Sequence, residues 1–138
     1  MASLSERIEA ELENIEAVLR DMPSPATITN LSRLEIAGAS ALLHSFYLGV
    51  ENILKQMLAE KNVPIPTGDS WHRDLIDATF RIGIISSATR DSVKEYLAFR
   101  HFFAHAYAFT LDAARLQPLI ARVHSVFERF RGDIAPLL

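Results

Sequence analysis

The sequence predicts an all-α fold, an up-and-down bundle of four or five helices. Apolar residues recur at three- and four-residue spacing along several long segments, the pattern of helices that bury one face. No segment shows the strict apolar–polar alternation that is typical of a half-buried strand. A chain of 138 residues can bury one core, and it has no cysteine for a disulfide or a thiolate metal site. We therefore expect a single domain over residues 1–138.

The first helix is predicted to begin after Ser3, because Ser3 and Glu6 form the pattern of a capping box. The helix should end before Pro23, which begins a Pro-Ser-Pro sequence. Its buried face is carried by residues at helical spacing, namely Leu4, Ile8, Leu12, Ile15 and Leu19.

A second, longer helix is predicted from about Ile28 to Lys61. An interior glycine weakens a helix, so a bend is expected near Gly38 or Gly49. The residues expected to face the core are Leu31, Leu34, Leu42, Phe46, Val50, Ile53, Leu54, Met57 and Leu58. The segment from residue 62 to residue 68, which contains two prolines and a glycine, is predicted to be a loop.

Two further helices are predicted on the same grounds. The first covers residues 72–82, with Asp69 or Ser70 near its N-cap and Gly83 at its C-terminal end. The last helix of the chain starts at or near Asp112 and reaches about Arg131. Pro118 falls in its first turns, where a missing amide donor costs least. Its expected buried stripe is Leu116, Leu119, Ile120, Val123, Val126, Phe127 and Phe130.

Between these two lies a helix that is predicted to be capped by Ser86 or Ser87 and to extend to about Tyr107. On an ideal helix, Arg100 and Tyr107 lie within about 20° of each other, whereas His105 lies about 140° from Arg100. Four positive or titratable groups share one arc, namely Arg90, Lys94, His101 and His105. The opposite, apolar face is expected in the core, and it consists of Phe99, Phe102, Phe103 and Ala106. An apolar seam that a partner helix could cover consists of Val93, Leu97 and Ala104.

The C-terminal part of that helix carries the residue types of a phosphodiester site. Arg100 can hold a phosphate, His105 can transfer a proton near neutral pH, and Tyr107 offers a hydroxyl that can be modified. The formal net charge of −3 argues against binding nucleic acid through bulk charge, so any such contact must be local. The plainer alternative is a bundle helix that shows basic residues to solvent and aromatic residues to the core.

Metal chemistry is not expected. His101 and His105 stand four residues apart and could share a zinc ion, but no third ligand converges on them in the sequence. No paired acidic motif indicates a carboxylate-metal nuclease. We therefore expect neither a metal nor another cofactor. The N-terminus lacks the features of a secretory signal, and no apolar run is long enough for a membrane span, so a cytoplasmic protein without a membrane partner is expected.

The pattern Arg100-x4-His105-x-Tyr107 resembles the signature of the HEPN superfamily, and specifically of its HepT-like branch. The resemblance is clearest over residues 71–119. It includes Leu75-Ile76-Asp77-Ala78, the turn Gly83-Ile84-Ile85, Leu111-Asp112, and the earlier helix with Phe46, Glu51, Asn52 and Lys55. His101 stands where many relatives carry asparagine, so the position stays polar.

This resemblance implies a metal-independent endoribonuclease, the toxin of a toxin–antitoxin pair. Arg100 and His105 would be its catalytic residues. Tyr107 would be the acceptor of AMP from a cognate nucleotidyltransferase of the MNT type, which silences the toxin. The substrate would be RNA, with tRNA among the candidates. Candidate RNA or phosphate contacts are His101, Arg90 and Lys94.

A homodimer is expected on two grounds, the resemblance and the chemistry. A single His105 offers one proton-transfer group, whereas a two-fold dimer that brings the two motifs together offers two. Two alternatives of other classes remain open. One is a non-catalytic module that recruits a nucleotidyltransferase or binds a nucleotide, and the other is a structural helical adaptor.

Overall fold

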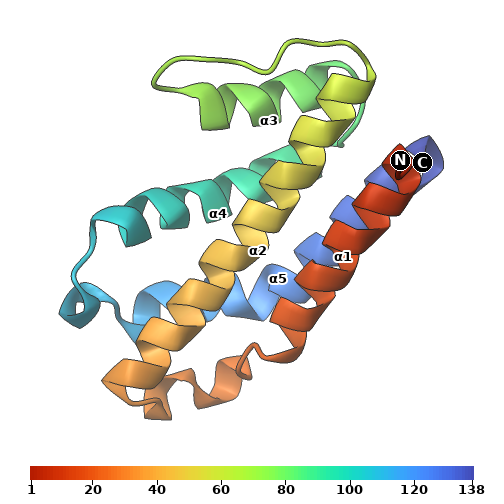
Figure 1. Cartoon of the computed structure of the whole chain (residues 1–138). Coiled ribbons are helices and arrows are strands. Elements are labelled where there is room, and N and C mark those ends of the chain that lie inside the picture. Colours follow the sequence, from red (N-terminus) through yellow and green to blue (C-terminus); the bar gives the residue numbers. More distant parts are fainter.

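The computed structural model describes residues 1–138 and confirms the all-α class (Figure 1). The elements in chain order are α1 (Leu4–Arg20), η1 (Pro25–Asn30), α2 (Arg33–Glu60), α3 (Trp71–Arg81), α4 (Ser87–His105), η2 (Ala108–Thr110), α5 (Ala113–Ile134) and η3 (Ala135–Leu137), where η denotes a short 3-10 helix. The long helix α2 contacts each of the other four α-helices. Figure 1 shows α1 and most of α5 on one side of α2, and α3 and α4 on the other. None of the helices is both long and apolar enough to cross a membrane.

Helix α2 begins at Arg33, so the predicted start near Ile28 was wrong. Pro25–Asn30 forms η1, and Ser32 then closes a capping box with Glu35, in which each side chain accepts a hydrogen bond from the other residue's backbone amide. Leu34 lies between these two residues, in the first turn of α2, and is 84% exposed, so it is not part of the predicted core.

Close packing of α1 on α2 depends on Gly49. The helix runs without interruption from Arg33 to Glu60, through both glycines at which a bend was predicted. A Cβ atom built on Gly49 would lie 2.5 Å from Cγ1 of Ile15, which is fully buried in α1. Glycine at this position therefore lets the two helix backbones approach each other.

The end of α3 follows the prediction made from Gly83. This glycine has a positive φ of 84°, its amide donates to the Phe80 carbonyl, and the amide of Ile84 donates to the Thr79 carbonyl. Together these bonds form a Schellman motif, which requires the left-handed conformation that glycine adopts without strain. The buried Ile84 then carries the chain toward α4.

The two ends of α4 are held differently. At its N-terminus, Ser86 caps the helix, and Asp133 of α5 accepts hydrogen bonds from the Ser86 amide and from the hydroxyls of Ser86 and Thr89. At its C-terminus the helix stops at His105, because Ala106 is extended, with φ −88° and ψ 145°. The predicted end at Tyr107, and with it the stripe shared by Arg100 and Tyr107, was therefore wrong.

The core largely follows the predicted stripes. All seven residues predicted on α5 are buried, and the Tyr96 hydroxyl of α4 donates to the Leu119 carbonyl at 2.7 Å. The apolar face of α4 was predicted less well. Phe99 is buried, but Phe102 and Phe103 are only half-buried, because they lie near the C-terminal end of the helix. Of the predicted seam, Val93 is buried within the chain itself.

Candidate active site

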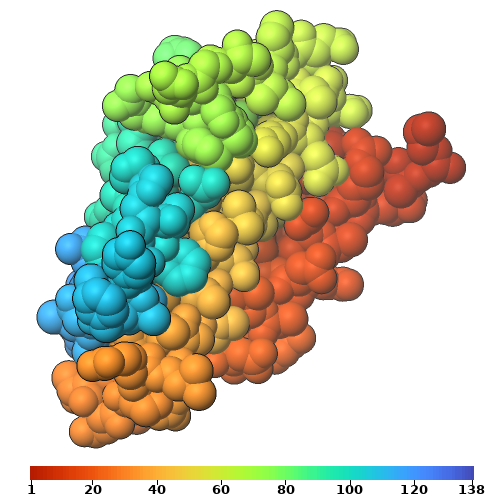
Figure 2. All heavy atoms as spheres, turned by 60° about the vertical axis from the view of Figure 1, so that its left-hand side comes forward, coloured from red at the N-terminus to blue at the C-terminus, as the bar shows by residue number.

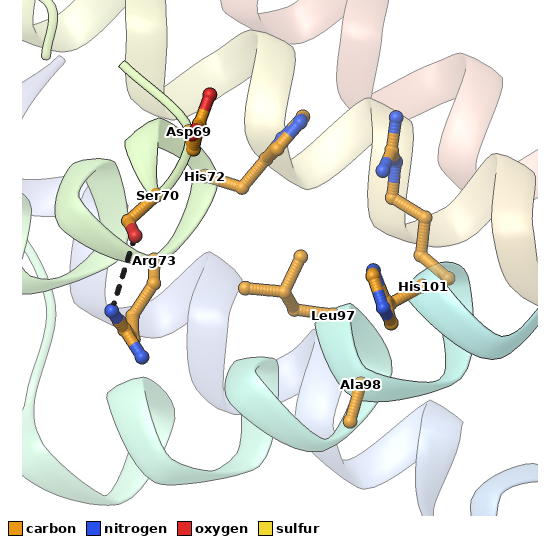
Figure 3. Close-up of a pocket in the computed structure, with 8 residues that line it drawn as sticks. Asp69, Ser70, His72, Arg73, Leu97, Ala98 and His101 are labelled. Carbon is orange, nitrogen blue, oxygen red and sulfur yellow. Dashed lines mark hydrogen bonds between the residues drawn. The ribbon is translucent and has the colours of Figure 1, made fainter. Parts of the chain in front are cut away.

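Two adjacent hollows lie along the C-terminal half of α4. The first, the α3–α4 pocket, has a volume of about 350 Å³ and is lined by Asp69, Ser70, His72, Arg73, Leu97, Ala98, Arg100 and His101 (Figure 3). The second, the Tyr107 hollow, has a volume of about 440 Å³ and is lined by His101, Phe102, His105, Ala106, Tyr107 and Thr110. His101 lines both, so the two hollows are neighbours. Figure 2 shows the end of α4 and the segment after it, in cyan, between the green loop and α3 above and the orange N-terminal part of α2 below.

The guanidinium of Arg100 is not neutralised within the chain. Its Nε atom is buried without a hydrogen-bond partner, and Arg100 takes part in none of the ion pairs. A buried donor left unpaired is destabilising, and such a group in a native fold calls for an explanation. We attribute the unpaired donor to the place of Arg100 in the fold, because Arg100 lines the α3–α4 pocket, which can accept an anion.

The other predicted cations are paired and line neither hollow. Nε of Arg90 lies 2.9 Å from the carboxylate of Asp91, and Nζ of Lys94 lies 2.7 Å from that of Asp77 on α3. The basic arc predicted on α4 is thus partly neutralised by carboxylates of the same chain.

A buried carboxylate lies at the centre of a network behind the pocket. Glu51 of α2 is 3% exposed, and its Oε2 atom accepts a hydrogen bond from the Tyr47 hydroxyl at 2.7 Å. The same oxygen lies 2.6 Å from Nδ1 of His72, and Nζ of Lys55 lies 3.8 Å from the other oxygen, Oε1. Burying a carboxylate is tolerated when donors of this kind surround it.

The pKa values of two α2 side chains, Tyr47 and His44, depend on both Glu51 and Arg100. Burial, followed by the hydrogen bond to Glu51, raises the pKa of the Tyr47 hydroxyl, so Tyr47 acts as a donor. Burial, followed by the positive charge of Arg100, lowers the pKa of His44. The ring of His44 packs on Phe103 with 5.3 Å between centroids.

His72 enters the α3–α4 pocket from the first turn of α3. Its ring stacks on Trp71 at 3.7 Å between centroids, and Nζ of Lys55 lies 4.5 Å from the centroid of the Trp71 ring. The second ring nitrogen, Nε2, has no hydrogen-bond partner and is not among the buried unpaired atoms. In Figure 3 His72 lies on the α3 side of the pocket and His101 on the α4 side.

His101 and His105 occupy the last two turns of α4, and both are exposed. Their rings meet edge to face with 4.9 Å between centroids. Arg100 lines the α3–α4 pocket, whereas His105 lines the Tyr107 hollow. The structure therefore does not bring this guanidinium and this imidazole into one hollow of one chain.

Tyr107 is accessible. It lies just beyond the end of α4, is 72% exposed, and stacks on Phe109 at 5.5 Å between centroids with the rings nearly parallel. The two other tyrosines of the chain, Tyr47 and Tyr96, are each 1% exposed. Tyr107 is thus the one tyrosine hydroxyl that a macromolecular partner can reach.

A family model described as HepT-like protein matches residues 38–138, which include nearly all of α2 and every residue of both hollows. No curated protein and no solved structure matches the chain.

Proposed function

Because the chain belongs to the HepT-like family, we propose that it is a metal-independent endoribonuclease, the toxin of a toxin–antitoxin pair. Membership of this family places the chain in the HEPN superfamily and suggests a toxin-like function. The observation that carries the finer proposal is that Arg100 lines the α3–α4 pocket and forms an ion pair with no carboxylate of its own chain. An arginine that forms no ion pair inside its own chain is available to bind the scissile phosphate of RNA.

The proposed reaction uses the 2′-hydroxyl of the ribose as nucleophile. Arg100 stabilises the negative charge that develops on the phosphorus oxygens, and His105 transfers a proton as general acid or base. Nothing in this scheme requires a metal ion. DNA lacks the 2′-hydroxyl and is not a substrate.

We propose that the working site combines two chains. Arg100 and His105 lie in separate hollows, so a two-fold homodimer that apposes these surfaces would place Arg100 of one subunit beside His105 of the other. His101, which lines both hollows, would contact the RNA between them. Arg90 and Lys94 would add a weaker attraction for the RNA backbone, since nearby carboxylates already pair with them.

Tyr107 is the proposed acceptor of AMP from a cognate nucleotidyltransferase of the MNT type. Its exposure supports this role, because an acceptor hydroxyl must enter the active site of another protein. An attached AMP group is bulky and anionic. It would fill the Tyr107 hollow, reduce the positive potential beside His101 and His105, and repel RNA.

A ribonuclease assay in EDTA tests the catalytic part of the proposal. Arg100→Ala and His105→Ala should each lower the rate of RNA cleavage by about 100-fold or more. The matched controls are Arg129→Ala and His124→Ala, which remove exposed residues of α5 that line neither hollow, and they should keep the wild-type rate. Full activity in either Arg100→Ala or His105→Ala would contradict the assigned roles.

Intact mass spectrometry tests the modification. Incubation with ATP and a cognate nucleotidyltransferase of the MNT type should add mass in AMP units and stop RNA cleavage. Tyr107→Phe should gain no mass and should stay active in the presence of the partner. A full mass gain in Tyr107→Phe would show that another residue is the acceptor.

A further inference from the structure

We propose that His72 is a second catalytic imidazole, which acts with Arg100 in the α3–α4 pocket, and that Glu51 is the residue that positions it. This inference rests on the proposed ribonuclease function and deepens it. It assigns the proton acceptor for the ribose 2′-hydroxyl to α3, a helix that carries no part of the Arg100–Tyr107 cluster.

The first support is the orientation of the ring. Oε2 of Glu51 lies 2.6 Å from Nδ1 of His72, and Tyr47 donates its hydroxyl hydrogen to the same oxygen. A carboxylate acceptor beside Nδ1 holds the proton on that nitrogen and leaves the lone pair on Nε2. This is the arrangement in which a carboxylate orients a histidine that acts as a general base.

The second support is the rigidity of the ring. Trp71 stacks against His72 from the preceding position of α3, and Lys55 sits over the Trp71 ring while lying 3.8 Å from Glu51. The imidazole is thus fixed by an aromatic face and by a hydrogen bond in the ring plane. A group fixed in this way needs no reordering when substrate arrives.

The third support is the state of the free nitrogen. Nε2 of His72 forms no hydrogen bond with another group of the chain, and it is not a buried atom. The side chain is 20% exposed and lines the pocket. His72 and Arg100 therefore line the same pocket from two different helices, His72 with an acceptor that no protein group uses and Arg100 without an ion-pair partner.

The chemistry balances without another reactant. Nε2 of His72 takes the proton of the 2′-hydroxyl, the 2′-oxygen forms a bond to phosphorus, and the bond from phosphorus to the 5′-oxygen breaks. The leaving 5′-oxygen receives a proton from the imidazolium of His105 of the partner subunit. Arg100 stabilises the phosphorane between the two steps. The products are a 2′,3′-cyclic phosphate and a 5′-hydroxyl end.

The pH dependence follows from this assignment. The rate should rise with pH as His72 loses its proton and fall as His105 loses the proton it donates. Charged and titratable groups face His72 from α2, from α4 and from its own end of α3, namely Glu51, Lys55, Arg100, His101, Asp69 and Arg73. Two guanidiniums against one carboxylate line the pocket, which favours an anionic substrate.

His72→Asn is the sharpest test variant, because the asparagine amide can still donate to Glu51 from the position of Nδ1 but has no group at Nε2. The expected result is an unchanged melting temperature and a loss of cleavage of about 100-fold or more, with loss of the acidic limb of the pH–rate profile. Added imidazole should partly restore cleavage by His72→Ala. Glu51→Gln should reduce the rate by about 10- to 100-fold and shift the acidic limb. His124→Ala is the matched control.

The outcomes separate this inference from the proposed function. Wild-type activity and an unchanged pH profile in His72→Asn, alongside inactive Arg100→Ala, would overturn the role of His72 and leave the ribonuclease proposal standing. A wild-type chain that cleaves no RNA would overturn both. If His72→Asn melts lower than the wild type, absence of imidazole rescue in His72→Ala would still refute proton transfer by His72.

Discussion

Replacement of Arg100 by methionine should make the protein more stable while it abolishes cleavage. The Nε atom of Arg100 is buried without a partner, and a buried unpaired donor costs about 1–3 kcal/mol. Methionine keeps most of the apolar stem of arginine and carries no donor. A gain of about 1–2 kcal/mol in the free energy of unfolding is expected, because part of the guanidinium is hydrated and its desolvation is incomplete.

This gain in the free energy of unfolding should appear as a higher melting temperature. For a chain of this length, 1 kcal/mol corresponds to roughly 4 °C, so the melting temperature of Arg100→Met should rise by about 4–8 °C. Circular dichroism at 222 nm and urea titration both measure it. The same protein samples should show no RNA cleavage, which makes Arg100 a site where function is kept at the expense of stability.

Arg90→Met is the matched control on the same helix. Arg90 donates to Asp91 at 2.9 Å and lies 4.2 Å from the centroid of the Phe80 ring, so its removal should leave the melting temperature unchanged or slightly lower. A melting temperature for Arg100→Met below that of the wild type would refute the reasoning, since it would mean that the guanidinium stabilises the fold.

Three further predictions concern the scaffold. Gly49→Ala should lower stability by about 1–3 kcal/mol, because its Cβ would meet Ile15 at 2.5 Å. Gly38→Ala, which lies in open space on the same helix, should raise stability by about 0.5–1 kcal/mol. Equal melting temperatures of the two variants would contradict the close packing of α1 on α2 at Gly49. Asp133→Ala should cost about 1–3 kcal/mol in urea unfolding, because Ser86 and the buried Thr89 lose their acceptor, yet RNA cleavage should persist. Burial and the charge of Arg100 lower the pKa of His44 in the folded protein, so folding favours the neutral imidazole. The stability that His44 contributes is complete above its ordinary pKa of 6.5, and it is lost as the pH falls from 6.5 through the lowered pKa. His44→Gln should therefore lose less stability than the wild type between about pH 7.5 and pH 5.5, and an identical loss in both proteins would exclude His44 as the cause.

Local sequence patterns predicted the helices whose buried stripes are regular. The α5 stripe from Leu116 to Phe130, the cap at Ser86 and the C-terminal glycine at Gly83 all depend on residues close together in sequence. The start of α2 was misplaced although Ser32 and Glu35 form a readable capping box, because an apolar residue at Ile28 extended the periodic pattern past it. The end of α4 carries no such signal, since neither proline nor glycine stands near Ala106.

Only the part of the candidate site whose residues are close in sequence could be predicted. Arg100, His101, His105 and Tyr107 lie within eight residues, so a motif could find them together. The pair of Glu51 and His72 is separated by 21 residues and meets only because α3 packs on α2, which no local pattern encodes. Glu51 and Lys55 entered only as part of the family resemblance, and His72 only as the expected start of a helix, so nothing in the sequence predicted that Glu51 and His72 meet.

The most direct test of the central claim is the chemistry of the cleaved ends. The purified chain should be incubated in EDTA with an RNA oligonucleotide and with the same strand carrying 2′-deoxyribose at every position. The prediction is cleavage of the RNA alone, with 2′,3′-cyclic phosphate and 5′-hydroxyl ends detected by mass spectrometry, and loss of those products in Arg100→Ala. Cleavage of the deoxy strand, a requirement for a divalent cation, or intact RNA throughout would contradict a ribonuclease that acts through the 2′-hydroxyl.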